Sequence, residues 1–236
     1  MAQHTRIARP TGPAKPRVPQ LLMRVWDAPT RLFHWAVVLL IALSYISVRQ
    51  EWVQTHFLSG YTLLALLIFR LIWGFVGSET SRFRQSLRNP LEGLRHLASF
   101  RGPRQPDTEI GHNAAGGWMV LFLLAVLLFQ VTTGLLAGDE KGPLGPLGHN
   151  LTVAGGQWAA AAHGVSFNVV VGLSALHVVA IGAYAVLKRH DLVRPMITGK
   201  KRLPATMQQP RFASHLLAVL VLAGAAASVW ALVQFG

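Results

Sequence analysis

Two histidines in the stretch "AAAHGVSFNVVVGLSALHVVAIGAYAVL" have a spacing suited to membrane-embedded chemistry. His163 and His177 lie fourteen residues apart in an otherwise apolar segment that is long enough to span a membrane. Fourteen residues of α-helix turn through about 1400°, about 40° short of four full turns, and rise about 21 Å. Both imidazoles are therefore expected on one helix face, near opposite ends of the hydrocarbon core. Ionisable residues in membrane spans are rare and usually face the protein interior, so this face is a candidate functional surface.

The elements that must position these histidines are long apolar runs. Hydrophobic residues make up 52% of the 236-residue chain and charged residues 13%, about half the usual share of globular proteins. Five runs approach or exceed the length of about 20 residues that crosses a bilayer: 30–48, 56–76, 114–137, 157–187 and 213–235. We therefore expect an all-α integral membrane protein, with a four-helix transmembrane bundle and a fifth, C-terminal transmembrane helix. The expected divisions are a disordered segment 1–21, a bundle domain 22–200, and a basic linker with the fifth helix, 201–236.

The net charge of +13 is distributed unevenly between the two ends of the expected helices. Of the 22 Lys and Arg residues, six lie at or before Arg31, six between the second and third runs, and seven between the fourth and fifth. The other two loops carry one each, Arg49 and Lys141. This alternation predicts a cytoplasmic N-terminus and a C-terminus on the opposite side of the membrane. Anionic lipid head groups account for the basic charge, and no nucleic-acid partner is expected.

Other features of the chain narrow the chemistry. The absence of cysteine excludes cysteine-ligated iron–sulfur clusters and covalently attached c-type haem. The first 20 residues have no apolar core, so the first run is expected to act as an uncleaved membrane anchor. Asp27 or Thr30 can cap that first helix, and a short interfacial helix is expected at 90–99.

Two further histidines provide partners at matching depths. His34 lies near the cytoplasmic end of the first run, and His56 begins the second run at the external end. By depth, His34 pairs with His177 and His56 pairs with His163. Two such pairs suit b haems with both axial positions filled by histidine. Zinc takes about four ligands, and no intramembrane Asp or Glu completes that set. For each histidine alone, hydrogen bonding to a neighbouring carbonyl is a competing explanation, which the matched set disfavours.

Arg70 and His112 are secondary candidates for the same chemistry. Arg70 lies fourteen residues after His56, on the same helix face, at the level of the inner pair or just below it. It could bind a haem propionate, or its side chain could extend to the membrane surface; both explanations stay open. His112 begins the third run on the cytoplasmic side and could contact a propionate or a quinone, or simply lie at the interface.

The motifs together resemble a known family. "RVWDAPTRLFHW", "HFLSGYTLLALLIFRLIWGF" and "GHNAAGGWMVLFLLAVLLFQVTTGLL", followed by His163 and His177, resemble the bacterial cytochrome b561 family over about residues 22–200. Within it the chain is most similar to the cytochrome b subunit of nickel-dependent hydrogenases. The resemblance implies four helices that hold two bis-histidine b haems, with His34, His56, His163 and His177 as axial ligands. A shorter first loop and the fifth helix depart from that branch, so either a hydrogenase-like protein or a periplasmic c-type cytochrome is expected as partner.

The expected function is electron transfer between this periplasmic partner and the membrane quinone pool, as a subunit and not a complete enzyme. Quinone is expected beside the His34–His177 pair, with His112 as a group that titrates near physiological pH. A stand-alone superoxide:quinone oxidoreductase is the alternative, disfavoured by Asp139 and Glu140 in an external loop that has few cations. A haemless scaffold would need none of the four histidines.

Overall fold

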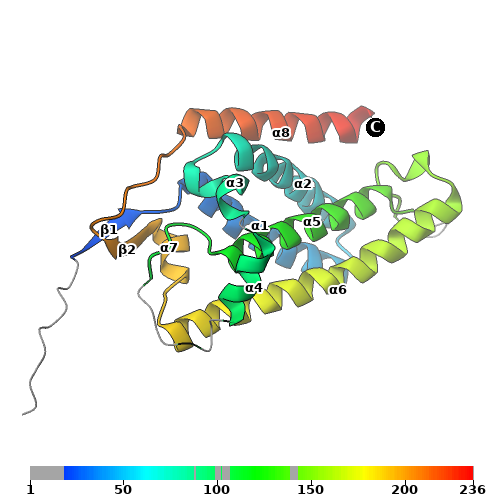
Figure 1. The fold of residues 1–236 in the computed structure, drawn as a ribbon. Coiled ribbons are helices and arrows are strands. Elements are labelled where there is room, and N and C mark those ends of the chain that lie inside the picture. The colour runs from blue at the N-terminus through cyan, green and yellow to red at the C-terminus, as the bar shows by residue number, and fades with distance from the viewer. Residues whose placement is uncertain (1–18, 88, 99–101, 103–106, 139–142, 236) are drawn as a thin grey trace, which may run out of the picture.

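The computed structural model describes residues 19–87, 89–98, 102, 107–138 and 143–235. Its five longest helices are each long and apolar enough to cross a membrane, as expected from the sequence (Figure 1). They are α1 (Ala28–Arg49), α2 (Val53–Val76), α5 (Ala114–Leu136), α6 (Val153–Ala183) and α8 (His215–Phe235). A π-helical segment, Tyr184–Lys188, continues α6 without a break. The chain is thus a mostly helical, multi-pass membrane protein.

Short elements connect these helices. The helical ones are a 3-10 turn at Glu79–Ser81, α3 (Phe83–Ser86), α4 (Pro90–Ala98), a 3-10 turn at Gly148–Asn150 and α7 (Val193–Thr198). Helix α4 agrees with the short helix expected at 90–99, and it packs against α5. The loop with Asp139 and Glu140 lies outside the described residues.

A small antiparallel sheet departs from the all-helical prediction. Strand β1 (Gln20–Arg24) pairs with β2 (Lys200–Pro204), so that Gln20 lies opposite Pro204 and Arg24 opposite Lys200. The predicted boundaries at 21/22 and 200/201 therefore cut through two paired strands. Residues 1–18 of the segment expected to be disordered lie outside the described part of the chain. The sheet joins the start of α1 to the connection between α7 and α8.

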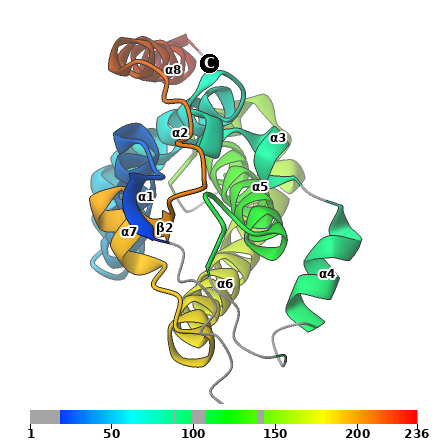
Figure 2. The same ribbon diagram turned by 60° about the vertical axis from the view of Figure 1, so that its left-hand side comes forward.

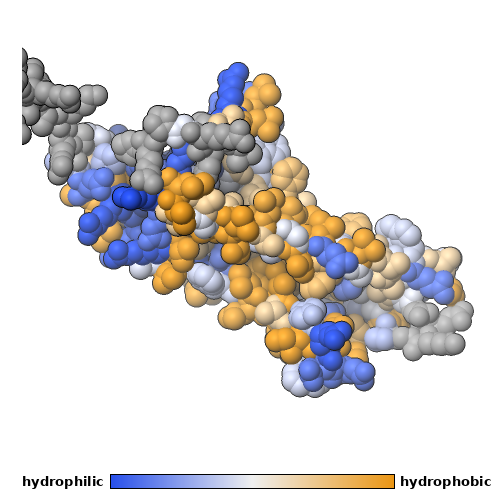
Figure 3. Space-filling view, turned by 90° about the horizontal axis from the view of Figure 1, so that it is seen from below, coloured by the Kyte–Doolittle hydropathy of each residue, from blue (hydrophilic) through white to orange (hydrophobic). Residues whose placement is uncertain are grey.

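The membrane helices form two antiparallel pairs. Helix α1 packs against α2 and α5 against α6, while α2 joins the pairs through its contact with α5 (Figure 2). Leucines of α2 and α5 form the centre of the core, and α8 covers another face of α2. Helix α6 is mostly exposed and packs chiefly on α5. Apolar side chains cover the middle of the molecule in the space-filling view, which suits contact with lipid (Figure 3).

The two ends of the bundle differ in polarity. We refer to the end where α1 and α5 begin and α2 and α6 finish as the basic end; it also carries the sheet and α7 (Figure 1). Hydrophilic residues gather there in Figure 3. The opposite end, formed by the α1–α2 and α5–α6 connections, is the far end.

A buried carboxylate ties the elements at the basic end together. Asp27, 2% exposed, caps α1 by accepting a hydrogen bond of 2.6 Å from the Thr30 backbone N–H. It also accepts hydrogen bonds from Ser81 Oγ at 2.8 Å and from Trp73 Nε1 at 3.2 Å. Burial raises the pKa of Asp27, but hydrogen bonds from Ser78, Thr30 and Ser81 outweigh it and hold the pKa below its ordinary value. Of the two predicted caps, the structure therefore uses Asp27.

Candidate functional site

The four membrane histidines face one another as two pairs. His34 of α1 lies opposite His177 of α6, with ring centroids 6.3 Å apart and an angle of 54° between the ring planes. His56 of α2 lies opposite His163 of α6, with centroids 6.1 Å apart and an angle of 89°. The structure thus brings together the pairs that the depth argument predicted. We refer to them as the inner pair, nearer the basic end, and the outer pair, nearer the far end.

The spacing within each pair suits a shared metal ion. Two imidazoles bound to opposite sides of one metal, each at a metal–nitrogen distance of about 2 Å, have ring centroids about 6 Å apart. Both pairs have this spacing. Within the described part of the chain, no cluster of three or more His, Cys, Asp or Glu residues forms a metal site. Each pair offers two histidines, which would suit a metal whose remaining ligands belong to a prosthetic group.

Backbone carbonyls orient both rings of the outer pair. His56 Nδ1 lies 3.1 Å from the carbonyl oxygen of Ser44, and His163 Nδ1 lies 2.8 Å from that of Gln130. A carbonyl oxygen only accepts hydrogen bonds, so each Nδ1 carries the proton. Each Nε2 then keeps its lone pair for a metal. This is the usual arrangement of metal-binding histidines, whose second nitrogen donates to a carbonyl or carboxylate.

Gln130 of α5 is a functional candidate that the sequence reasoning missed. Its side-chain nitrogen lies 3.2 Å from both ring nitrogens of His163, and Ser166 Oγ donates to its side-chain oxygen. With Nδ1 protonated, the Gln130 amide can donate to His163 Nε2, and a metal bound at Nε2 would have to replace this contact. A lone glutamine inside an apolar helix was the available signal, because a polar residue in a membrane span needs a partner.

Glycines provide close approach and space around the outer pair. A Cβ atom at Gly134 would lie 2.7 Å from His163 Cε1, so α5 comes close to the imidazole only because residue 134 lacks a side chain. At Gly60 and Gly164, a Cβ would meet nothing within 4 Å. Gly164 directly follows His163, and Gly60 lies about one helical turn after His56. The planar group of a haem would need room there.

The inner pair has a different environment. His34 Nδ1, Arg70 Nη1 and His112 Nδ1 are buried and have no hydrogen-bond partner within the described residues. Arg70 is only 3% exposed, and its guanidinium carbon lies 4.8 Å from the centre of the Phe83 ring. Its guanidinium is therefore enclosed by protein near the basic end. Buried polar atoms are nearly always paired, so these atoms fit polar ligand groups, such as a propionate at Arg70.

His112 lies beside the inner pair but does not titrate as expected. Its ring packs 4.7 Å from that of Trp26, and it interacts electrostatically with His34 and His177. Burial of the imidazole, aided by the positive charge of Arg70, lowers the pKa of His112 from 6.5 to about 3. The expectation of a group that titrates near physiological pH is therefore wrong. His112 is neutral there and can only exchange hydrogen bonds.

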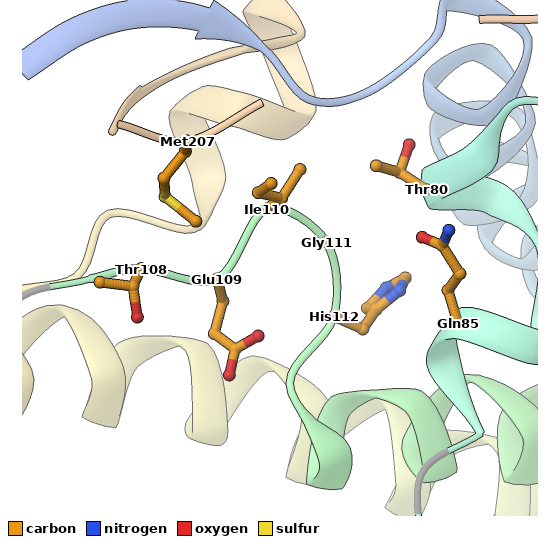
Figure 4. A pocket seen from close by; sticks show the side chains of 8 residues that line it. All are labelled: Thr80, Gln85, Thr108, Glu109, Ile110, Gly111, His112 and Met207. Atoms are coloured by element: carbon orange, nitrogen blue, oxygen red, sulfur yellow. The ribbon is translucent and has the colours of Figure 1, made fainter. Parts of the chain in front are cut away.

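A pocket of about 360 Å³ opens at His112. Its lining residues come from the α2–α3 connection, α3, the segment before α5 and the chain after β2 (Figure 4). Thr80, Gln85 and His112 lie together on one side, and Glu109 and Met207 lie on the other. The pocket combines polar groups with apolar surface next to the inner pair.

A membrane bundle with paired imidazoles at two depths belongs to the class of haem-binding electron-transfer proteins. A family model described as prokaryotic cytochrome b561 matches residues 25–199, and the chain belongs to this family. The resemblance read from the motifs is thereby confirmed. Membership implies a b-type haem and a role in membrane electron transport.

Two relatives carry the names of hydrogenase subunits. A probable Ni/Fe-hydrogenase B-type cytochrome subunit of Bradyrhizobium diazoefficiens is 23% identical over 217 residues, covering 75% of this chain and 85% of that protein. A probable Ni/Fe-hydrogenase 1 B-type cytochrome subunit of Escherichia coli K12 is 26% identical over 148 residues, covering 49% of this chain and 60% of that protein.

Proposed function

We propose that this chain is an electron-transfer cytochrome b with two b haems, one held by His34 and His177 and the other by His56 and His163. The observation that supports this best is the spacing of the two imidazole pairs, 6.3 and 6.1 Å between centroids, at two depths of the bundle. When bound, a b haem supplies a one-electron iron couple, and with histidine at both axial positions it has no open position for a substrate.

Other residues of the chain would orient the histidines and bind a haem propionate. The carbonyls of Ser44 and Gln130 keep His56 and His163 in the tautomer that presents Nε2. Arg70 would neutralise a propionate at the inner pair, since its guanidinium is buried and Nη1 is without a partner among the described residues.

The redox partner is proposed to lie on the periplasmic side. The names of the relatives favour a hydrogenase-like protein, and a c-type cytochrome is the other candidate. The charge distribution supports an inner-membrane location, with the basic end in the cytoplasm and the C-terminus in the periplasm. Electrons would then cross between the far end and the quinone pool.

Alanine substitution of each histidine tests the ligand pairs. His34→Ala and His177→Ala should alter the same component of the reduced α-band and of the redox titration, and His56→Ala and His163→Ala the other. A shared component for His34→Ala and His163→Ala would refute the pairing. If all four single variants kept both components, the ligand assignment would be refuted altogether.

Quinone is proposed to bind in the pocket at His112, beside the inner pair. Neutral His112 and the Gln85 amide can donate hydrogen bonds to quinone oxygens, and Ile110 and Met207 offer apolar contact. Because His112 does not titrate near pH 7, it would orient the quinone, and the protons would have to come from water or another group.

His112→Phe tests this site. Quinone-linked oxidation of the reduced protein should slow about tenfold or more, which corresponds to one hydrogen bond to a buried partner, while both haem spectra stay unchanged. His215→Phe, at an exposed position at the start of α8 on the same side, is the matched control. Unaltered quinone kinetics in His112→Phe would refute its role. An inhibitor that shifted only the outer component would refute the site.

A further inference from the structure

A second pocket at the basic end is lined by none of the four membrane histidines and not by His112. It has a volume of about 360 Å³ and lies between the end of α6, the start of α7 and the β1–β2 sheet. Six cationic residues line it, together with the carboxylates Asp107 and Asp191, so these eight residues carry a net charge of +4. The cations are Lys188, Arg189, Arg194, Lys200, Lys201 and Arg202. This excess of positive charge predicts an anionic ligand.

Both carboxylates at the pocket already accept hydrogen bonds from groups of the protein. Asp107 accepts a hydrogen bond of 2.7 Å from Lys201 Nζ and lies 3.8 Å from His190 Nδ1. Asp191 Oδ1 accepts from the backbone N–H groups of Val193 and Arg194, capping the start of α7. Arg189, Arg194 and Arg202 are exposed, and no ion pair to another described residue involves them. These three guanidinium groups are therefore free to bind a phosphate group.

Two residues with left-handed backbone conformations shape the walls. Arg189 has φ 59°, an uncommon conformation for a residue with a side chain, and directs the chain away from α6 after Lys188. Gly199 has φ 78° and directs it from α7 into β2; a Cβ there would lie 2.9 Å from the Trp26 carbonyl oxygen. The cationic side chains are thus presented by a constrained backbone and not by a free tail.

The pocket lies where the apolar surface of a membrane helix ends. The span that contains α6 finishes at Lys188. Next to the pocket, Val186 is 72% exposed, and Ile197 of α7 and Leu22 of β1 are 58% and 59% exposed. The cations of the pocket therefore adjoin exposed apolar side chains at the end of a membrane span. A free phosphate ion would make no use of that apolar surface.

We propose that this pocket binds the phosphate of an anionic phospholipid, with the acyl chains lying along α6. Basic pockets beside membrane helices on the cytoplasmic side are suited to such head groups. A bound lipid would link α6, which is packed chiefly on α5, to the sheet and α7. The proposal depends on the membrane location of the chain and not on the haem assignment.

The test compares charge variants of the full, haem-loaded protein in neutral detergent. Native mass spectrometry would measure binding of dioleoyl phosphatidylglycerol and dioleoyl phosphatidylcholine, which differ in head-group charge. The wild type should bind the anionic lipid about tenfold more tightly, and Arg189→Gln/Arg202→Gln should lose about tenfold in that affinity. Arg84→Gln/Arg95→Gln, which removes two exposed arginines elsewhere at the basic end, should stay within about twofold.

Other results would overturn the proposal. Equal losses in both double variants would mean that the charge acts diffusely and that the pocket is not a site. Displacement of the lipid by millimolar inorganic phosphate would identify a site for a small anion. The charge-preserving variant Arg189→Lys/Arg202→Lys should retain lipid binding, and its failure to do so would contradict the electrostatic basis. The haem spectrum should be the same in all variants, which separates this proposal from the one on electron transfer.

Discussion

The contact between Gly134 and His163 gives a sharp prediction for the outer pair. In Gly134→Ala, the new methyl group would lie 2.7 Å from His163 Cε1 and 3.0 Å from Nδ1. Carbon atoms in normal contact are about 3.5–4.0 Å apart, so the imidazole must move by about 1 Å. That movement would break the 2.8 Å hydrogen bond from Nδ1 to the Gln130 carbonyl.

The cost can be estimated from these contacts. Overpacking a filled site costs about 1–3 kcal/mol, and a lost hydrogen bond costs about 0.5–1.5 kcal/mol. The two together amount to about 1.5–4.5 kcal/mol, or at least roughly tenfold in the affinity of the outer site for its haem. The inner pair, His34 and His177, should be unaffected because it lies about 21 Å from the outer pair along α6.

Haem retention measures this effect. Wild-type and Gly134→Ala proteins would be incubated with apomyoglobin as a haem acceptor, and the loss of each spectral component would be followed with time. The outer component should leave faster in the variant while the inner one leaves at the wild-type rate. Gly224→Ala is the matched control, since a Cβ at that position of α8 meets nothing within 4 Å. Wild-type retention of both components in Gly134→Ala would refute the assignment of His163 as a constrained ligand.

Two further predictions concern stability and orientation. The pKa of Asp27 is lower in the folded protein than its ordinary value of 3.8, so its ionised form contributes stability above that value, and the contribution disappears as the pH falls through the folded pKa. Asp27→Asn should therefore lower the unfolding temperature at pH 7, by an amount that corresponds to about 1–3 kcal/mol of stability. The stability of the variant should also fall less steeply than that of the wild type from about pH 5 downward. Parallel curves of stability against pH for the two proteins would contradict this. A periplasm-active reporter fused after Gly236 should be active, and one inserted near Arg101 inactive, whereas the opposite result would invert the proposed electron path.

The sequence predicted the membrane helices well because their apolar length is a local property. The five spans, the short helix α4 and the Asp27 cap each depend on residues close together in the chain. Helix ends were less certain. Helix α2 begins at Val53, three residues before His56, and α6 begins at Val153, four residues before the predicted start. These shifts leave the histidine pairs unchanged, because depth differences of about 20 Å exceed one helical turn.

The remaining features depend on contacts between distant residues. Strand β1 pairs with β2, which lies about 180 residues further along the chain. Neither five-residue segment has a sequence pattern that indicates the strand it pairs with. The contact of Gln130 with His163 likewise depends on how α5 packs on α6. The pKa of His112 was mispredicted because its unperturbed value ignores burial near Arg70. Local patterns thus gave the candidate ligands, while their surroundings required the packed structure.

The haem content of the purified protein tests the central claim most directly. A pyridine haemochrome assay, with protein quantified by amino-acid analysis, gives the type of haem and its number per chain. Our account predicts b haem at two per chain, with His56→Ala and His34→Ala each reduced to about one. A value of one in the wild type would contradict the two-pair assignment, and a value of zero would contradict the proposed function as a whole.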